Sequence, residues 1–131
     1  TVLERGKVGP DDPQSGALAE IAPVGRVRRI ADGETLRLGS VAVTAHFTPG
    51  HTHGGTSWSW EACEERRCLR IVYADSQTPV SAEGFRFSNN TSYPNAVADF
   101  ARGQALLENL PCDILLTPPG CGVAVGTSDG P

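Results

Sequence analysis

Apolar and polar residues alternate through much of the first half of the chain, which predicts a series of short strands. The clearest case is Val41–Phe47, where Val41 and every second residue after it are apolar and share one face. Asp-Gly at 32–33 and Gly-Ser at 39–40 are turn signals on either side of another short strand. The predicted strands are 26–30, 36–38, Val41–Phe47, 56–60 and 69–73.

A helical period replaces this alternation after Pro94, at a position where Pro favours the start of a helix. Apolar residues then recur at helical spacing until Leu110-Pro111 ends the pattern. Gly103 weakens this helix by about 1 kcal/mol relative to Ala. An apolar segment, 112–116, follows as a last strand. The stripe expected to face the sheet comprises Val97, Phe100, Ala101, Leu107 and Leu110.

The order of several strands, one helix and one more strand predicts an α/β fold with α+β-type layers. We expect a mostly antiparallel sheet with a covering helix, formed by residues 1–118 as one domain. The polar segment 76–92 has no periodicity, and loops of this length in a compact domain are often functional. The Gly- and Pro-rich segment 119–131 is interpreted as an irregular tail, either disordered or foreign to the domain.

The composition narrows the classes of partner. The 131 residues carry a formal net charge of −4 without any run of Lys or Arg, so we expect neither nucleic acid nor a membrane as a partner. No stretch approaches the roughly 18 consecutive apolar residues of a membrane span, and no signal peptide is recognisable. The sequence contains no Met and begins at Thr1, which indicates a processed or partial product.

Two of the four cysteines, Cys63 and Cys68, bracket a charged tetrapeptide between two predicted strands. Cysteines that face each other across a hairpin can meet the geometry of a disulfide, and a loop this short stabilises the fold by about 2 kcal/mol. The alternative is a pair of free thiols in a reducing cytosol. The charged, turn-like loop favours the disulfide, which indicates a periplasmic or secreted protein.

All three histidines, His46, His51 and His53, lie close together in the sequence. Neutral imidazole is the commonest metal ligand, and the glycines around His51 and His53 allow a tight turn that presents a ring at the sheet edge. His46 falls within a predicted strand and is interpreted as a packing residue. A catalytic zinc needs about three protein ligands, and three histidines on one strand and its following loop cannot easily converge.

Three segments carry a family resemblance. Residues 46–60 contain Gly-His-Thr-His-Gly-Gly-Thr followed by a Trp-containing strand, residues 73–76 read Tyr-Ala-Asp-Ser, and residues 110–118 read Leu-Pro-Cys-Asp-Ile-Leu-Leu-Thr-Pro. Together, and in this order, they resemble the subclass B3 metallo-β-lactamases. The first segment of that family reads Gly-His-Thr-Pro-Gly-Ser/Gly-Thr, so His53 stands where the family has Pro.

The resemblance implies that residues 1–118 are the C-terminal half of an αβ/βα sandwich that hydrolyses β-lactam antibiotics with two zinc ions. His51 resembles a zinc ligand of the first metal site, and His53 is expected near that site. Ser76 and Thr78 resemble substrate-binding residues. Asp75 is interpreted as structural, and no catalytic residue is assigned within the chain. The intact enzyme is expected to be a monomer in the periplasm or outside the cell.

The match to the family breaks down at the metal site. The family's leading His-x-His-x-Asp-His motif is absent, and Pro119-Gly120-Cys121 stands where the last zinc His should follow Thr117-Pro118. One of six expected ligands is therefore present, so we expect the chain alone to be inactive. The abrupt break suggests a frameshift or truncation in 119–131. Cys112 resembles a Cys that, in the family, forms a disulfide with a Cys in a terminal helix. Without that helix, Cys112 is expected to be unpaired here.

Two other functions stay open from the sequence. One is a glyoxalase-II-like zinc thioesterase, which shares the Gly-His-Thr element. The Tyr-Ala-Asp-Ser segment and the Trp-rich strand favour the lactamase over it. The other is a non-catalytic half-domain or pseudoenzyme able to pair with a complementary half, and the missing ligands favour this reading for the chain in isolation.

Overall fold

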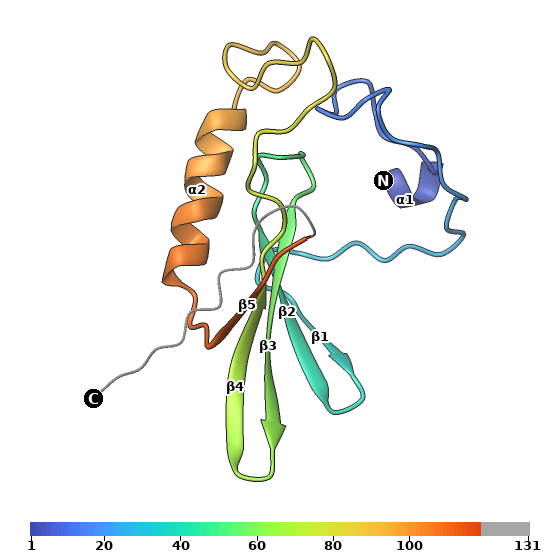
Figure 1. The fold of residues 1–131 in the computed structure, drawn as a ribbon. Coiled ribbons are helices and arrows are strands. Elements are labelled where there is room, and N and C mark those ends of the chain that lie inside the picture. Colours follow the sequence, from blue (N-terminus) through green and yellow to red (C-terminus); the bar gives the residue numbers. More distant parts are fainter. Residues whose placement is uncertain (119–131) are drawn as a thin grey trace.

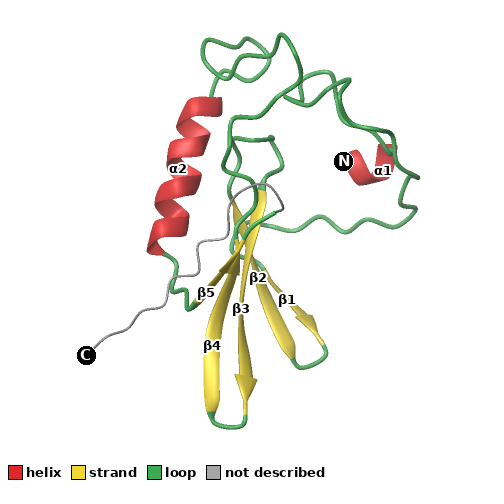
Figure 2. Ribbon diagram, in the orientation of Figure 1, coloured by secondary structure: helices red, strands yellow, loops and turns green. Residues whose placement is uncertain are grey.

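The computed structural model describes residues 1–118, which are built around a five-stranded sheet with the strand order β1-β2-β3-β4-β5 (Figure 1, Figure 2). The order of strands in the sheet is therefore their order along the chain. A short helix precedes the sheet, and a longer helix connects its last two strands. The elements are α1 (Val2–Arg5), β1 (Thr35–Leu38), β2 (Val41–Phe47), β3 (Thr56–Glu64), β4 (Arg67–Tyr73), α2 (Ala96–Asn109) and β5 (Ile114–Leu116).

The first four strands form an antiparallel meander, as the sequence predicted. β2 has the predicted bounds, whereas β3 and β4 are longer than 56–60 and 69–73. They are longer because cross-strand pairing continues as far as Glu64 opposite Arg67. The connection is then only two residues long, and Glu65 takes the positive φ of 53° that tight hairpin turns use.

The segment before β1 differs from the prediction. Residues 26–30 form no strand, and Arg28 instead makes an ion pair with Glu34 in the turn that leads into β1. The helix α1 was not predicted, because four residues are too few to show a helical period. It is closed by a capping box in which the Thr1 hydroxyl accepts the Glu4 backbone N–H.

β5 makes the sheet mixed, because α2 carries the chain back so that β5 pairs parallel to β4. The sheet remains mostly antiparallel, as expected. Arg70 on β4 and Asp113 before β5 join the two strands with several contacts. The guanidinium donates to both carboxylate oxygens at 3.0 Å, and the Arg70 backbone N–H donates to the same carboxylate at 2.7 Å.

α2 runs alongside the sheet on the side of β4 and β5 (Figure 1). The sheet face toward it carries small and polar residues, and Thr44 and Ser59 of that face line a hollow together with Leu110 at the end of the helix. Val72 on the same face is only 1% exposed. Within residues 1–118, neither helix combines the length and apolarity needed to cross a membrane.

Part of the predicted helical stripe is wrong. Val97 is 57% exposed and Ala101 is also exposed, whereas Ala96 and Gly103 are buried. A Cβ added at Gly103 would lie 3.4 Å from Cα of Thr48. The backbone of α2 therefore comes close to the loop after β2 at a position without a side chain. The helix therefore packs through small residues against a loop, and Gly103 permits this close approach at some cost in helix propensity.

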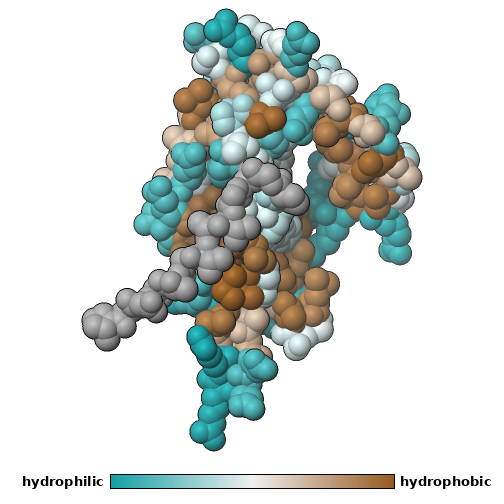
Figure 3. Space-filling view, in the orientation of Figure 1, coloured by the Kyte–Doolittle hydropathy of each residue, from teal (hydrophilic) through white to brown (hydrophobic). Residues whose placement is uncertain are grey.

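The other face of the sheet, the apolar face, has no covering layer among the described residues. Its most exposed large side chains are Leu38 at 71%, Val41 at 41%, Phe47 at 40%, Ile114 at 39% and Leu116 at 41%. Figure 3 shows apolar side chains gathered over the strands. Exposed patches of this kind mark surfaces that contact another polypeptide or a ligand. The apolar face comprises Leu36, Leu38, Val41, Val43, Ala45, Phe47, Trp58, Trp60, Leu69, Ile71, Tyr73, Ile114 and Leu116.

Candidate functional site

The predicted site residues gather at one edge of the sheet. β2 and β4 each pair antiparallel with β3, and β5 pairs parallel with β4, so these three strands run in the same direction. Their carboxyl ends therefore meet at a common edge (Figure 1). The chain continues there as the turn 48–55 after β2, the segment 74–78 after β4, and Thr117-Pro118 after β5.

The turn 48–55, called the His51 turn below, is fixed to the sheet and to α2. Thr48 is fully buried, and its hydroxyl lies 2.7 Å from the hydroxyl of Ser57 on β3. Gly50 has a φ of 143°, which side-chain-bearing residues rarely adopt. A Cβ at Gly50 would also lie 2.7 Å from the ring of Phe100 on α2. The turn can rest on the helix at this point only because Gly50 has no side chain.

His51 is oriented by one hydrogen bond from its ring. Nδ1 lies 2.8 Å from the backbone oxygen of Thr78, and a carbonyl oxygen can only accept, so Nδ1 carries the proton. In the neutral ring the free lone pair is then on Nε2, which makes no hydrogen bond to residues 1–118. Histidines that bind metals commonly have their second ring nitrogen held in this way. The bond also joins the loops that follow β2 and β4.

Ser76 and Thr78, the predicted substrate-binding residues, lie together beside this bond. Their hydroxyl oxygens are 3.0 Å apart, and both residues are half-buried. Asp75 accepts the backbone N–H of Thr56 at 3.1 Å through one oxygen and that of Ser76 at 2.8 Å through the other. Both carboxylate oxygens are thus engaged by backbone groups, as its structural interpretation requires.

The three histidines have separate surroundings. His46 Nε2 lies 2.7 Å from the Ser59 hydroxyl on the neighbouring strand, in agreement with its interpretation as a packing residue. His53 is exposed, and its Nε2 lies 3.7 Å from a carboxylate oxygen of Asp11. Its ring stacks on Tyr93 with a centroid distance of 3.8 Å and an interplanar angle of 31°. His53 therefore lies in the His51 turn but contacts other groups.

The sequence did not single out Tyr93, which is only 2% exposed and contacts the His51 turn. Its phenol donates to a carboxylate oxygen of Asp99 on α2 at 2.8 Å. Burial, followed by the hydrogen bond to Asp99, raises the pKa of Tyr93 above its ordinary value. The one available signal was an aromatic residue in a polar loop next to the helix start.

Gln77 was also missed. Its side-chain N–H donates to the Ser76 backbone oxygen at 3.1 Å and reaches the Thr48 backbone oxygen at 3.4 Å, so it bridges the two loops. Its Oε1 atom is buried and has no hydrogen-bond partner among the described residues. A polar residue in a polar segment gives no sequence signal that would separate Gln77 from its neighbours.

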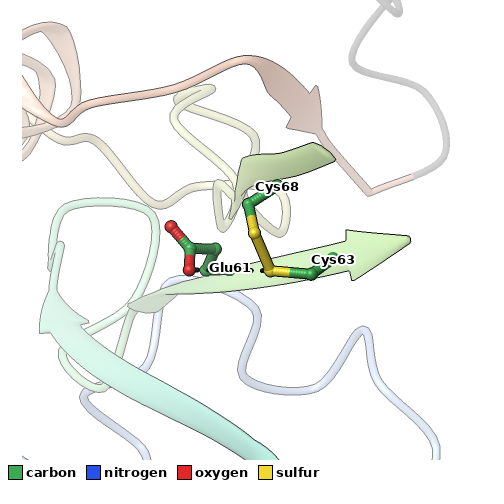
Figure 4. A group of neighbouring side chains, drawn as sticks. All are labelled: Glu61, Cys63 and Cys68. Carbon is green, nitrogen blue, oxygen red and sulfur yellow. Dashed lines mark hydrogen bonds between the residues drawn. A yellow bond between two sulfur atoms is a disulfide. The ribbon is translucent and has the colours of Figure 1, made fainter. Parts of the chain in front are cut away.

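Metal-binding groups do not converge on His51 within residues 1–118. In this part of the chain, ligand atoms of three or more His, Cys, Asp or Glu residues lie within 4.8 Å of one another only at Glu61, Cys63 and Cys68 (Figure 4). The two sulfurs are bonded at 2.05 Å, which confirms the predicted disulfide. A disulfide sulfur has neither thiolate charge nor a proton to donate. The 3.7 Å approach of Cys63 to Glu61 is therefore a contact and not a metal site.

Of the other predictions on cysteines and the tail, the structure describes Cys112 but not Cys121 or residues 119–131. Cys112 is exposed and makes no disulfide with another cysteine of residues 1–118. Cys121 and the tail 119–131 lie outside the described residues.

The donor chemistry of His51 fits a zinc ligand, but one imidazole does not make a site that needs about three protein ligands. The other ligands of such a site have to come from beyond residues 1–118.

A mainly apolar hollow of about 340 Å³ lies next to this edge, between α2 and the ends of β4 and β5. Its volume lies at the low end of the range for small-molecule sites. Thr78 belongs both to its wall and to the contact with His51, so the hollow adjoins the predicted site. It is lined by Ala74, Asp75, Gln77, Thr78, Leu107, Glu108, Leu115, Thr117 and Pro118.

Three solved structures show what this chain is similar to. It is 51% identical to "Rm3 metallo-beta-lactamase", with a TM-score of 0.85 over 88% of this chain and 43% of that one. It is 46% identical to MEM-A1, a subclass B3 enzyme from a soil metagenome library, with a TM-score of 0.84 over 88% and 44%. It is 43% identical to SMB-1 bound to 2-mercaptoethanesulfonate, with a TM-score of 0.82 over 88% and 44%. The chain spans less than half the length of these structures, and no family model matches it.

Proposed function

The chain belongs to the subclass B3 metallo-β-lactamases, and from this premise we propose that it supplies part of a zinc-dependent site that hydrolyses the β-lactam ring amide of antibiotics. Penicillins, cephalosporins and carbapenems are the proposed substrates. The complete site belongs to the intact domain, which is proposed to hold two zinc ions. The chain alone is proposed to be inactive, because its described residues offer one suitable histidine.

The hydrogen bond between His51 and Thr78 is the observation that supports this proposal best. It fixes the ring in the tautomer whose Nε2 lone pair can bind zinc, at an edge where the ends of three strands meet. Ser76 and Thr78 place two hydroxyls beside it, 3.0 Å apart. In the proposal these hydroxyls bind the carboxylate of the substrate, and His51 holds the metal.

The zinc would supply a nucleophile at neutral pH, because it lowers the pKa of a bound water toward about 7. The contribution of this chain is to orient the groups around that chemistry. Asp75 ties the start of β3 to the segment after β4 through the backbone N–H groups of Thr56 and Ser76. The carbonyl of Thr78 keeps His51 in one tautomer. His53 is proposed as a neighbour of the site without binding metal.

Zinc content and hydrolysis of a chromogenic cephalosporin test the proposal. Both are measured for the chain alone and for the chain joined to the remaining part of a B3 relative such as the Rm3 enzyme. We expect stoichiometric zinc and hydrolysis in the joined protein only. Stoichiometric zinc in the isolated chain would contradict the proposed inactivity, and a joined protein that folds and binds zinc without hydrolysing the cephalosporin would contradict the proposed reaction.

His51→Ala in the joined protein isolates the role of the ligand, with His46→Ala as the matched control. Loss of a group that holds a metal ligand in place typically costs about 10- to 100-fold in metal affinity or activity, so loss of the ligand itself should cost at least about 100-fold. His46 bonds to Ser59 within the sheet, and its replacement should leave zinc content unchanged. Equal losses in the two variants would remove the special role of His51.

An oxidising compartment, the periplasm or the exterior of the cell, is proposed for the protein. The supporting observation is the disulfide between Cys63 and Cys68 across the β3–β4 hairpin. Thiol titration of the denatured protein, purified with its native redox state trapped by alkylation, tests this. Peptide mass mapping should find Cys63 and Cys68 unreactive until a reductant is added, and their reaction without reductant would contradict the proposed compartment.

The glyoxalase-II-like thioesterase is the weaker enzymatic candidate. The Gly-His-Thr element alone fits both, but the three similar structures reported above are all β-lactamases at 43% identity or more. Hydrolysis of a glutathione thioester by the joined protein, measured in parallel with the cephalosporin, separates the two activities.

The non-catalytic half-domain is a second candidate for the chain in isolation, and the apolar face favours it. Leu38, Val41 and Leu116 are large side chains that are at least 41% exposed on this face. A second β-layer with an apolar face, supplied by the part of the B3 relatives that this chain does not span, is the proposed partner. Association measured by titration with that separately produced part tests it, and absence of binding would contradict it.

A further inference from the structure

The His51 turn is held on both sides of His51, by Phe100 of α2 and by Tyr93. On one side, Gly50 lies against Phe100 on α2, where an added Cβ would be 2.7 Å from the Phe100 ring. On the other side, the His53 ring stacks on the Tyr93 ring at a centroid distance of 3.8 Å. The residue directly before His51 therefore meets Phe100, and the residue two positions after it meets Tyr93.

Tyr93 is itself held in place and can act as a fixed support. It is 2% exposed, and its phenol donates to Asp99 on the first turn of α2 at 2.8 Å. Asp99 is also paired with Arg102 at 2.6 Å. The Tyr93 backbone N–H donates to the side chain of Asn90 at 2.9 Å, which fixes the loop from which the ring projects. The position of the phenol is thus set from both the loop and the helix.

His51 needs such a support because its own ring makes one hydrogen bond, to the Thr78 oxygen. That bond joins two loops, and its length depends on where the His51 turn lies relative to the segment after β4. Tyr93 fixes the turn through the stacked His53 ring, and Phe100 of α2 limits its movement at Gly50. A shift of the turn by one ångström would break the bond and free the ring to adopt the other tautomer.

We propose that Tyr93 is a positioning residue for His51, which holds the turn where Nδ1 meets the Thr78 oxygen and Nε2 is left for a metal. His53 is the side chain through which the turn stacks on Tyr93. A carboxylate oxygen of Asp11 lies 3.7 Å from His53 Nε2, but both side chains are exposed, so the stack on Tyr93 is the contact that holds His53. That His51 binds a metal rests on the proposed function, whereas the orientation of its ring by Tyr93 does not.

The tautomer of His51 in the isolated chain, read from long-range ¹H–¹⁵N NMR correlations, is the test. Spectra are recorded at about pH 8.5, where an ordinary imidazole is neutral. We expect the Nδ1–H form to predominate in the wild type. In Tyr93→Phe, which keeps the ring but removes the hydroxyl, and in His53→Ala, which removes the stack, that predominance should be lost.

Amide hydrogen exchange provides a second readout in the same samples. The Gly50 N–H bonds to the Thr52 oxygen at 3.1 Å within the turn, and its exchange should be roughly tenfold faster in both variants. Tyr73→Phe is the matched control, because Tyr73 is the other tyrosine of the chain and lies on the apolar face. It should change neither readout. His46 provides an internal reference, because its bond to Ser59 should stay intact.

A wild-type tautomer retained in both Tyr93→Phe and His53→Ala would overturn the proposal, as would equal effects of Tyr73→Phe. Both informative variants keep most of the buried volume, and a folded amide spectrum identifies samples that are fit for the test. Because the readout needs no zinc, a Tyr93-dependent tautomer together with failure of the joined protein to bind zinc would sink the proposed function alone.

Discussion

At Gly50 the absence of a side chain decides where the His51 turn can lie. The φ of 143° and the 2.7 Å distance from an added Cβ to the Phe100 ring act together, because the first disfavours any side chain and the second leaves no space for one. The turn and α2 are consequently in direct contact beside the candidate zinc ligand.

Gly50→Ala should lower the free energy of unfolding by about 1–3 kcal/mol, the usual cost of overpacking a close contact. Denaturant unfolding at constant m-value measures it. Gly54→Ala is the matched control in the same turn, since nothing lies within 4 Å of its added Cβ. Equal stability of the two variants would show that the contact with Phe100 is not tight.

Asp113 makes stability depend on acid pH. Its hydrogen bonds from Arg70 lower the pKa of Asp113 from 3.8 to about 2. Because the folded value lies below the unfolded one, the stabilisation is fully present above about pH 4 and is lost as the pH falls through about 2. Asp113→Asn should therefore lower the melting temperature at pH 7, and the difference from wild type should shrink toward pH 2.

Melting curves at several pH values measure this effect. Glu20→Gln is the control, because the Lys7–Glu20 pair is at 3.8 Å and both side chains are more than 60% exposed. Such surface pairs contribute little to stability. A melting-temperature difference for Asp113→Asn that stays constant from pH 7 to pH 2 would show that the carboxylate charge is not its cause.

At the scale of residues, the sequence motifs predicted which residue types belong to the candidate site. They did not predict contacts that depend on how distant segments fold together. His51, Ser76 and Thr78 stood out through their motifs, and the structure brings them together. The partner of His51 is a backbone oxygen, which has no residue signature. Tyr93 reaches the turn through the fold of the 74–95 segment, which periodicity does not describe.

At the scale of elements, the β3–β4 hairpin is joined by more residue pairs than any other two strands of the described sheet. Seven residue pairs join the two strands from Trp58–Tyr73 to Glu64–Arg67, and the disulfide closes the far end. Alternation predicted these strands well, because one face of each is apolar. It underestimated their lengths, since the polar residues next to the turn pair through their backbones without any apolar pattern.

Replacement of both Cys63 and Cys68 by Ser should lower the free energy of unfolding by about 2 kcal/mol, because the closed loop is short. Chemical denaturation followed by Trp fluorescence measures the change. Cys112→Ser is the control, since Cys112 is free and exposed. A double variant as stable as wild type would show that the disulfide does not reduce the conformational freedom of the unfolded chain, and would contradict this prediction.

α2 shows why a helical stripe can be misassigned. The apolar period placed Val97 and Ala101 toward the sheet, yet the contacts of the helix run through Ala96, Phe100 and Gly103. The helix packs against loops as well as strands, so small residues were required where the pattern favoured large ones. Packing partners distant in sequence decided the outcome, and the helix's own sequence does not contain them.

At the scale of the whole molecule, the two faces of the sheet are unequal. α2 runs along one face (Figure 1), whereas the apolar face carries the large exposed hydrophobic residues of the sheet. The buried apolar residues of the described chain are few and mostly small: Ala45, Val72, Ala74, Tyr93 and Ala96. Five large side chains of the apolar face, those of Leu38, Val41, Phe47, Ile114 and Leu116, therefore still expose at least 39% of their surface to water.

Leu116→Glu should weaken association with the complementary half by about 10- to 100-fold in Kd. Burial of a Leu side chain contributes about 1.5–3 kcal/mol, and a charge would replace it. Calorimetric titration measures the affinity. Val97→Glu is the control, because Val97 is 57% exposed but lies on α2, away from the apolar face. Equal weakening by both variants would exclude the apolar face as the specific interface.

The strand order has a consequence for folding kinetics. β1 to β4 pair with their nearest neighbours in sequence, whereas β5 reaches β4 only after residues 74–113 have been closed into a loop. Low contact order speeds folding and loop closure delays it, so the meander should form before α2 and β5 dock. The His51–Thr78 bond depends on the loop that closes last. Tautomer selection at His51 should therefore accompany the final folding phase, and metal binding there would report the end of folding rather than nucleate it.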